Sequence, residues 1–359
     1  MTNILHKFPH IEQLRNVITS LKHKYQNPVQ TSDGWVFDES LPLPTIEFEG
    51  TVKLHGTNGA VVIYPPLELD SYPERVYCQS RESVLTPEND NHGFCKFILN
   101  IDQKTLLESI PQELRYESFD SGQPIIVFGE WCGKGIQSGV AISQLPKMFV
   151  VFAAKVGDKW VSKDLVKLIG NEEKNIFNVY KSFVQWGIEI DFNNPEQMEK
   201  SVSILERWTK QVEEECPFAK TFGITGLGEG LVWCSHYDNR TKTFCGGNDG
   251  DPWMFKTKGE KHKNVKESKL VQLQPDVVNN IAELVASVVT EQRLKQGLEK
   301  LNEKGLDISK KNTPTFLNWI QEDIRRENKD ILEASGLTEK DQLVGIQKAA
   351  REWYLKVAK

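Results

Sequence analysis

A chain of 359 residues is long enough to form two domains around a large buried core. Its composition, 39% hydrophobic and 26% charged, is ordinary for a globular protein, and no stretch approaches the roughly 20 apolar residues that span a bilayer. The formal net charge of −6 excludes bulk attraction to nucleic acid, so such binding needs a local basic patch. The first residues lack the apolar core of a secretory signal, and we expect a cytoplasmic monomer with no membrane partner.

The six cysteines are scattered and include no C-x-x-C pair. Their spacing argues against a zinc site, and a disulfide framework is not expected in a cytoplasmic protein of this size. We therefore expect most of these thiols to be buried and to act as small hydrophobic side chains.

The N-terminal part of the chain is predicted to form one helix and then short strands. Pro9 suits the first turn of a helix, and apolar residues recur after it at helical spacing, namely Ile11, Leu14, Val17, Ile18 and Leu21. Strand-like runs follow in TIEFEGTVKLHG, AVVIY and ERVYCQS, with a turn predicted at residues 56–59. Thr86 and Pro87 predict the capped start of a helix that carries Phe94, Phe97 and Ile98.

The middle of the chain alternates strands with one long helix. PIIVFGEW and KMFVVFAAKV are strand-like, and Asp158 and Lys159 indicate a hairpin turn after the second run. Asn194 and Pro195 predict a capped helix whose apolar stripe comprises Met198, Val202, Leu205, Trp208 and Val212. Two further strands are predicted in GEGLVWCS and DPWMFKTK.

The periodicity changes after about residue 262, because nearly everything from Leu270 onward has helical spacing. The sequence therefore predicts an α+β fold in two domains. Residues 1–262 would form antiparallel β-sheets flanked by helices, and residues 263–359 would form an all-helical C-terminal domain. The joint between them is rich in lysine, at Lys256, Lys258, Lys261, Lys263, Lys266 and Lys269. A lysine run is most often a solvated face, so this patch does not by itself indicate nucleic-acid binding.

An ordered set of short motifs carries the functional signal. They are KLHGTN at 53–58, Ser80-Arg81, FGE at 128–130, Phe152, EGLV at 229–232 and FKTK at 255–258. A lone K-x-x-G is common by chance and usually marks a surface lysine before a turn. The joint occurrence is far more specific, because each piece lies at the end of a predicted strand.

This set resembles the covalent nucleotidyltransferase superfamily of ligases and capping enzymes. KLHGTN, FGEWCGKGIQ, EGLVW and FKTKGEKH are most similar to the RNA ligase 2 family, and the similarity spans residues 45–265. The resemblance implies an adenylyltransferase domain at 1–262, ATP and Mg²⁺ or Mn²⁺ as cofactors, and an ATP-dependent RNA ligase activity in RNA repair. Its substrates would be RNA ends with a 5′-phosphate and a 3′-hydroxyl, in a nicked duplex or a broken structured RNA.

The resemblance makes Lys53 the nucleophile that becomes linked to AMP. A lysine amine forms a phosphoramidate only when it is deprotonated, whereas a free lysine with a pKa near ~10.4 is almost wholly protonated at neutral pH. Lys256 and Lys258 alternate along a predicted strand and so point to one face. From there they would favour the uncharged amine by repulsion and would neutralise phosphate charge in the transition state. His55, inside the KLHGTN turn, is a further catalytic candidate, although a lone histidine is more often a packing residue.

The remaining motif residues are implied nucleotide contacts. Glu229 would hold the divalent ion, since Mg²⁺ prefers carboxylate oxygens. Glu130 would bind the ribose hydroxyls, and Arg81 would bind phosphate through its guanidinium. Asn58 would reach the ribose or the nucleic-acid phosphate. Phe152 would stack on adenine, or alternatively would serve as a core aromatic residue of its strand.

Two alternatives stay open. A DNA ligase or a capping-type enzyme shares the motifs, but those enzymes usually place a small β-barrel after the FKTKGEKH-type motif, where this chain has helical periodicity. A non-catalytic RNA-binding scaffold descended from a ligase would be expected to have lost Lys53, Glu229 or the lysine pair. All of them are present.

Overall fold

The computed structural model describes residues 3–31, 34–68, 71–182, 184–238, 243–244, 250–262 and 280–358. The chain divides into two compact units. The first unit comprises Met1–Ile11, Ile46–Ile190 and Lys210–Met254, and the second comprises Glu12–Thr45, Asp191–Thr209 and Phe255–Lys359. A functional boundary at residue 262 stays a prediction. Lys263, Lys266, Lys269, Cys245 and residues 270–279 of the predicted helical stretch lie outside the described residues.

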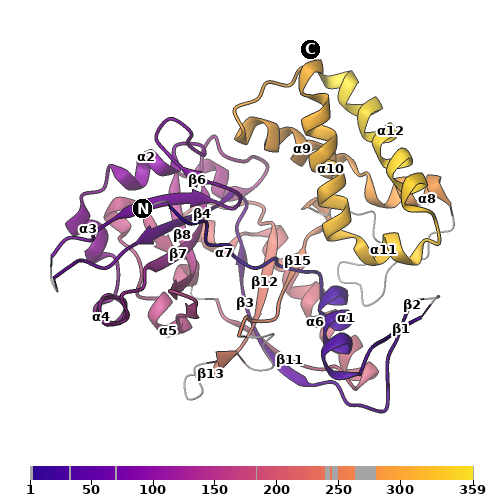
Figure 1. Ribbon diagram of the computed structural model, residues 1–359, viewed down its shortest axis with the longest axis horizontal. Helices are drawn as coiled ribbons and strands as arrows, with labels where there is room; N and C mark the ends of the chain where they lie inside the picture. The colour runs from indigo at the N-terminus through magenta and orange to yellow at the C-terminus, as the bar shows by residue number, and fades with distance from the viewer. Residues whose placement is uncertain are drawn as a thin grey trace. The chain divides into compact units, whose positions relative to one another are not determined.

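A seven-stranded sheet forms the centre of the first unit (Figure 1). Its strand order is β10-β8-β7-β4-β5-β6, and β9 pairs with β8. The strands are β4 (Thr57–Ile63), β5 (Val76–Ser80), β6 (Val84–Leu85), β7 (Ile125–Cys132), β8 (Met148–Val156), β9 (Lys159–Trp160) and β10 (Ile176–Asn178). The pairs are antiparallel, as predicted, except for β10 with β8, which is parallel. A parallel pair needs a crossover connection, and residues 161–175 provide it.

Alternation along these strands gives the sheet two different faces. One face packs against α2 (Phe94–Leu99), α3 (Gln103–Glu108), α4 (Gln112–Ser121) and α5 (Lys163–Val166), where Val61, Val127, Val151 and Phe94 belong to one buried core. The other face carries a smaller cluster, here called the Phe128 cluster, which comprises Ala60, Val62, Tyr77, Ile126 and Phe128. Phe8, Tyr64, Val84, Phe152 and Ala153 pack against it and are partly buried. Three of the predicted nucleotide contacts, Asn58, Glu130 and Phe152, lie on strands that form this second face.

A four-stranded sheet has the order β11-β3-β12-β15. Its strands are β3 (Thr45–Lys53), β11 (Trp186–Asp191), β12 (Gly230–Ser235) and β15 (Met254–Lys258). Two small hairpins pair β1 (Val29–Thr31) with β2 (Gly34–Val36) and β13 (Tyr237–Asp238) with β14 (Thr243–Phe244). The remaining short helices are α7 (Pro217–Lys220), η1 (Ala141–Gln144), η2 (Glu172–Lys174), η3 (Val179–Ser182), η4 (Glu260–His262) and η5 (Lys310–Asn312).

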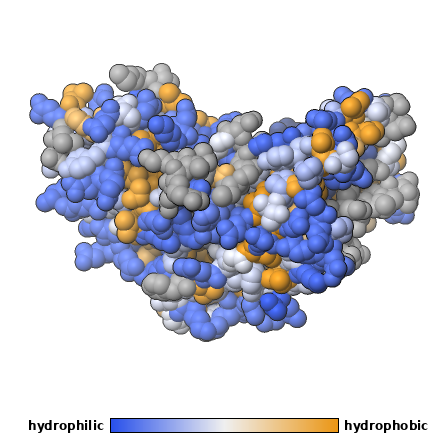
Figure 2. Space-filling view, turned by 90° about the horizontal axis from the view of Figure 1, so that it is seen from below, coloured by the Kyte–Doolittle hydropathy of each residue, from blue (hydrophilic) through white to orange (hydrophobic). Residues whose placement is uncertain are grey.

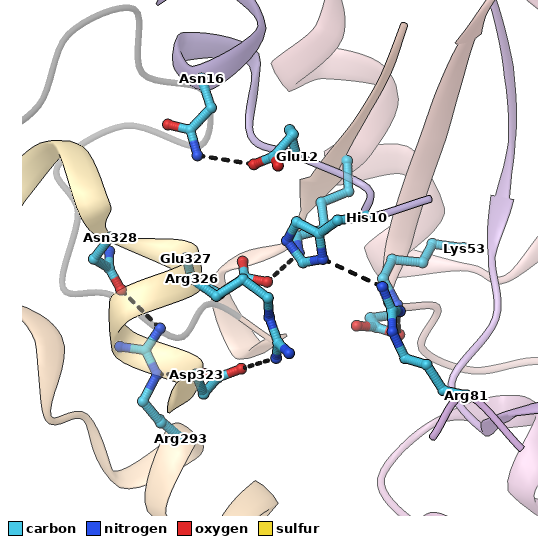
Figure 3. A network of polar contacts seen from close by, with 12 residues as sticks. His10, Glu12, Asn16, Lys53, Arg81, Arg293, Asp323, Arg326, Glu327 and Asn328 are labelled. Carbon is cyan, nitrogen blue, oxygen red and sulfur yellow. Dashed lines mark hydrogen bonds and ion pairs between the residues drawn. The ribbon is translucent and has the colours of Figure 1, made fainter. Parts of the chain in front are cut away.

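The C-terminal residues are helical, as the periodicity predicted. The helices are α8 (Ile281–Val288), α9 (Glu291–Glu303), α10 (Thr313–Glu327), α11 (Lys329–Ala334) and α12 (Glu339–Val357), and they share one apolar core. Phe316 and Tyr354 stack in this core with ring centroids 4.4 Å apart. A charged cluster lies beside it, in which the buried Arg293 bonds Asp323 at 2.8 Å and Asn328 at 2.8 Å (Figure 3). The Arg293 guanidinium also donates to the Val288 carbonyl.

Three predicted boundaries were wrong. Helix α1 spans Leu14–Tyr25 rather than starting at Pro9, because Glu12 is extended and accepts a bond from the Lys256 backbone at 2.8 Å. Helix α2 begins at Phe94, where the Asp90 carboxylate accepts from the Cys95 and Lys96 amides at 2.7 and 3.0 Å. Strand β4 already begins at Thr57, so the predicted turn at 56–59 is confined to the residues before it.

Other local predictions are confirmed. The Asn194 side chain caps α6 (Pro195–Glu214) by accepting from the Gln197 amide at 3.1 Å. Four cysteines, Cys78, Cys95, Cys132 and Cys216, are buried free thiols, and Cys234 is half-buried.

None of the described helices is long and apolar enough to span a bilayer. Hydrophilic residues predominate on the face shown in Figure 2, with hydrophobic residues in smaller patches.

Candidate active site

Antiparallel pairing of β3 with β12 brings together Lys53 and Glu229, which are 176 residues apart in sequence. Gly230, the first residue of β12, lies opposite Lys53, the last residue of β3. Glu229 directly precedes β12, so its carboxylate lies beside the Lys53 amine. Lys53 Nζ donates to Glu229 Oε2 at 2.8 Å, with the two side chains 20% and 2% exposed. The lysine is thus held by a buried carboxylate while keeping access to solvent.

The stretch from Lys53 to Thr57 links the two sheets, because β3 belongs to one and β4 to the other. His55 lies in this link, buried, with Nδ1 3.3 Å from Glu229 Oε2. The Gly56 amide donates to Glu130 Oε1 at 2.9 Å. A Cβ at Gly56 would overlap the Trp131 carbonyl oxygen and lie 3.0 Å from Glu130 Cγ. Glycine is therefore needed for the link to approach β7 closely.

The pKa of the Glu130 carboxyl departs strongly from its ordinary value. Burial raises the pKa of its carboxyl to about 7, against the lowering effect of the Lys53 charge. The negative charge of Glu229 raises it further, while His55 and the Gly56 hydrogen bond lower it. Two carboxylates therefore share the neighbourhood of one lysine, and one of them is partly protonated near neutral pH. Such perturbed carboxyl groups cluster at functional sites.

Asn58 and Phe152 lie on the same face of the seven-stranded sheet as Glu130. Asn58 is directly opposite Glu130 in the β4–β7 pair. In the β7–β8 pair, Phe128 faces Ala153 but Gly129 faces Val151, so Phe152 is the extra residue of a β-bulge. The bulge shifts the alternation of β8, so that both Phe152 and Ala153 pack against the Phe128 cluster.

Phe152 is partly buried, and its ring meets the Phe8 ring edge-on, with centroids 5.1 Å apart. This position suits either of the two predicted roles, since a bulge can direct a side chain toward a ligand and the cluster can equally retain it. The contact with Phe8 was not predicted. Phe8 lies in a segment without regular secondary structure or periodicity, so no sequence signal connected it to Phe152.

Arg81 follows β5, and its guanidinium is directed toward the His10 ring (Figure 3). Arg81 Nη2 lies 3.3 Å from His10 Nδ1. A guanidinium can only donate, so His10 Nδ1 accepts this bond as an unprotonated nitrogen. His10 was not singled out from the sequence.

Lys256 and Lys258 lie in the second unit, on β15, where they alternate with the buried Thr257. Their predicted alternation on one face is therefore present. Lys256 Nζ lies 2.7 Å from Glu327 Oε1, with side chains 12% and 9% exposed. Glu327, the last residue of α10, was missed by the motif analysis, since only the fold brings it to Lys256. The action of both lysines on Lys53 stays a prediction.

The sequence was compared with protein families and with curated proteins. The model of the RNA ligase family matches residues 46–245, a range that contains Lys53, Glu130 and Glu229. No curated protein matches the sequence.

Solved structures are similar only in part. A Naegleria gruberi RNA ligase with PPi is 16% identical over 73% of this chain and 60% of its own, with a TM-score of 0.38. A variant of that ligase with ATP and Mn is 15% identical over 73% of this chain and 60% of its own, with a TM-score of 0.37. An archaeal ATP-dependent RNA ligase is 12% identical over 92% of this chain and 65% of its own, with a TM-score of 0.36. The chain thus spans less than two thirds of the length of these proteins.

Proposed function

The chain belongs to the RNA ligase family, and from that membership and the site around Lys53 we propose that it is an ATP-dependent RNA ligase of the RNA ligase 2 type. It joins a 5′-phosphate to a 3′-hydroxyl RNA end through lysyl-AMP and adenylated-RNA intermediates. The observation that carries this proposal is the buried Glu229 carboxylate 2.8 Å from the Lys53 amine, inside the family match.

In the first step, Lys53 Nζ attacks the α-phosphorus of ATP, a P–N bond forms, and pyrophosphate leaves. The amine must first lose a proton. The Lys53 side chain is 20% exposed, which leaves that proton a path to solvent. Glu229 holds the amine in place, because its Oε2 accepts from Lys53 Nζ at 2.8 Å, and the same oxygen lies 3.3 Å from His55 Nδ1. In later steps the AMP passes to the RNA 5′-phosphate, and the 3′-hydroxyl then displaces it.

The sheet face supplies the nucleotide contacts of the proposal. Phe152 stacks on adenine from its bulge, while Glu130 and Asn58, cross-strand neighbours, bind the ribose hydroxyls. Arg81 binds phosphate. Lys256 and Lys258 neutralise charge on the reacting phosphate, as the motif resemblance suggests.

Glu229 is the proposed ligand of Mg²⁺ or Mn²⁺. The described residues contain no group of three or more His, Cys, Asp and Glu side chains that could hold a metal. Mg²⁺ is often held by one or two carboxylates together with substrate phosphates and water. When bound, the ion supplies positive charge that stabilises the phosphate in the transition state. The buried Glu229 oxygens are a suitable hard donor, already oriented by Lys53 and His55.

We also propose that residues 1–262 perform adenylation and that the helices of residues 263–359 help to engage RNA ends during repair. Lys256 is paired with Glu327 across this boundary, so a point substitution is a cleaner test than truncation. Glu327→Gln keeps Lys256 in place but removes this ion pair. An effect on adenylation of that variant would show that the helical part also acts in the first step.

The test is incubation with ATP labelled at the α-phosphate and a divalent ion, followed by denaturing electrophoresis. The wild-type protein acquires covalent label, whereas Lys53→Ala acquires none and still seals RNA supplied with a pre-adenylated 5′ end. Lys163→Ala is the matched control, because Lys163 forms a similar partly buried pair with Glu49 at 2.6 Å. Folded wild-type protein that takes up no label would contradict the proposal. End-joining on single-stranded RNA, nicked RNA duplex, RNA–DNA hybrid and nicked DNA then separates RNA ligase from DNA ligase activity.

A further inference from the structure

The N-terminal segment, residues 4–10, lies against the seven-stranded sheet (Figure 1). At its start, Tyr77 Oη donates to the Ile4 carbonyl at 2.8 Å and lies 3.3 Å from the Ile4 amide. Two residues on, the His6 amide donates to Gln79 Oε1 at 3.0 Å, and Gln79 Nε2 donates to the His6 carbonyl at 2.6 Å. The side chains of Tyr77 and Gln79 are both buried.

Two of the residues that anchor the segment lie on one strand. Tyr77 and Gln79 are two residues apart on β5, so their side chains project from the same face, and Arg81 follows in the turn after β5. Tyr77 and Gln79 bind the backbone of the segment, and Arg81 binds the His10 ring. Because Tyr77 and Gln79 bind backbone atoms of Ile4 and His6, these contacts do not depend on the side chains of those two residues.

Phe8 lies between these anchors and inserts among three aromatic rings. Its centroid is 5.2 Å from Phe128, 5.1 Å from Phe152 and 5.7 Å from Trp160. Phe128 and Trp160 are themselves 6.4 Å apart. Edge-to-face contacts of this kind fix ring orientation as well as burying apolar area. Phe152, as the extra residue of a bulge, lacks a directly opposed partner on β7, so its orientation depends on neighbours such as Phe8.

We propose that the N-terminal segment is part of the nucleotide site and that Phe8 is a positioning residue that holds the Phe152 ring in the orientation for stacking on adenine. This inference rests on the proposed function. Phe8 acts through Phe152 and contacts no reacting atom, so its loss weakens ATP binding and leaves the rate of the chemical step at saturating ATP little changed.

The experiment measures initial rates of lysyl-AMP formation against ATP concentration. Phe8→Leu removes the ring, Phe8→Met keeps more of the volume without a ring, and Phe8→Tyr keeps the ring. The control is Tyr64→Leu, which removes another partly buried aromatic ring from the same Phe128 cluster, one that lies 6.4 Å from Tyr77. The ATP concentration for half-maximal rate is compared because partial unfolding lowers the maximal rate but not that concentration.

We expect the half-saturating ATP concentration to rise about tenfold in Phe8→Leu and Phe8→Met, because a lost aromatic pair is worth roughly a factor of ten in binding. Phe8→Tyr should stay near the wild-type value, and so should Tyr64→Leu. If Phe8→Leu does not fold, Phe8→Met gives the same measurement. Unchanged half-saturation in the ring-less variants, or an equal rise in Tyr64→Leu, would overturn the inference. Absence of any adduct in the wild type would instead contradict the proposed function itself.

Discussion

Two regions of the molecule bury charged side chains, and they do so in opposite ways. In the helical core of the second unit, the fully buried Arg293 is matched by Asp323 and by the neutral acceptors Asn328 and Val288. In the first unit, Lys53 is shared by two carboxyl groups, Glu229 at 2.8 Å and the nearby Glu130, whose pKa burial raises to about 7. In the first cluster two arginines share one carboxylate, since Arg326 Nη2 also donates to Asp323 Oδ1 at 2.8 Å. In the second, two carboxyl groups share one lysine.

The difference separates structural from functional burial of charge. When a buried charge has its full set of partners, removing one of those partners destabilises the fold. The complete set is stabilising only in that comparison. A cluster with excess negative charge and a raised carboxyl pKa gains when a cation or a hydroxyl donor enters. Under the proposed function, the carboxyl groups around Lys53 bind a cation and the ribose, whereas each guanidinium nitrogen of Arg293 already has an acceptor within the fold.

The comparison is tested most strongly at Glu229. Glu229→Gln keeps the shape of the side chain but removes the charge that pairs with Lys53 and that we propose holds the divalent ion. We expect the adenylation rate to fall by about 10²–10³-fold, of the order seen when one transition-state contact is lost. Raising the metal concentration should restore part of it. Glu49→Gln, in the Lys163 pair, is the control, and an unchanged rate at low metal would remove Glu229 from the site.

Arg293 should instead matter for stability. Arg293→Met leaves the buried Asp323 with Arg326 as its remaining arginine partner. Breaking a buried pair costs up to about 3–5 kcal/mol of unfolding free energy. Arg325→Met is the matched control, since its pair with Glu339 is exposed and such pairs are worth less than about 1 kcal/mol. Urea unfolding of both variants measures the difference. Equal urea midpoints for the two variants would show that the buried pair contributes no more to stability than the exposed pair.

Glu130 predicts a pH dependence of stability in the metal-free and nucleotide-free protein. Its folded pKa of about 7 lies above the ordinary value near ~4.3, so the folded state binds the proton more tightly. The cost of ionising the buried group is absent below about pH 4 and grows as pH rises to about 7. Stability relative to Glu130→Gln should therefore fall across that window, by an amount on the order of 1–3 kcal/mol. Parallel pH profiles of urea unfolding for the two proteins would contradict the raised pKa.

The smallest expected effect concerns Phe152. If it stacks on adenine, Tyr and Trp should keep the ATP concentration for half-maximal adenylation near the wild-type value, while Leu should raise it up to about tenfold. If it serves only the Phe128 cluster, Leu should be tolerated best, because apolarity and volume then decide. Thermal stability and ATP dependence, measured on the same three variants, distinguish the two rankings.

The motifs and strands could be predicted because each depends on local pattern. The PIIVFGEW strand and the Asn194 cap appear where alternation and capping chemistry placed them, and β3 covers the first nine residues of the predicted run TIEFEGTVKLHG. Their meeting could be expected only through the resemblance. The structure adds the physical cause for one contact, since the β3–β12 register sets Gly230 opposite Lys53.

The missed features depend on tertiary contacts. Phe8 and His10 lie in a segment without regular secondary structure, which is held by Gln79 of β5 and by Arg81 after it, a pattern with no period in sequence. The bulge at Phe152 arises from the pairing of β7 with β8, which no single strand reveals. The start of α1 at Leu14 was mispredicted because Glu12 pairs with Phe255 instead of joining the helix.

The central claim, that Lys53 becomes linked to AMP, is tested most directly by locating the adduct. The wild-type protein is incubated with ATP and a divalent ion, digested, and analysed by mass spectrometry under conditions that preserve the acid-labile P–N bond. The account predicts AMP on the peptide that contains Lys53. AMP found on Lys256, Lys258 or another lysine, with Lys53 unmodified, would contradict it.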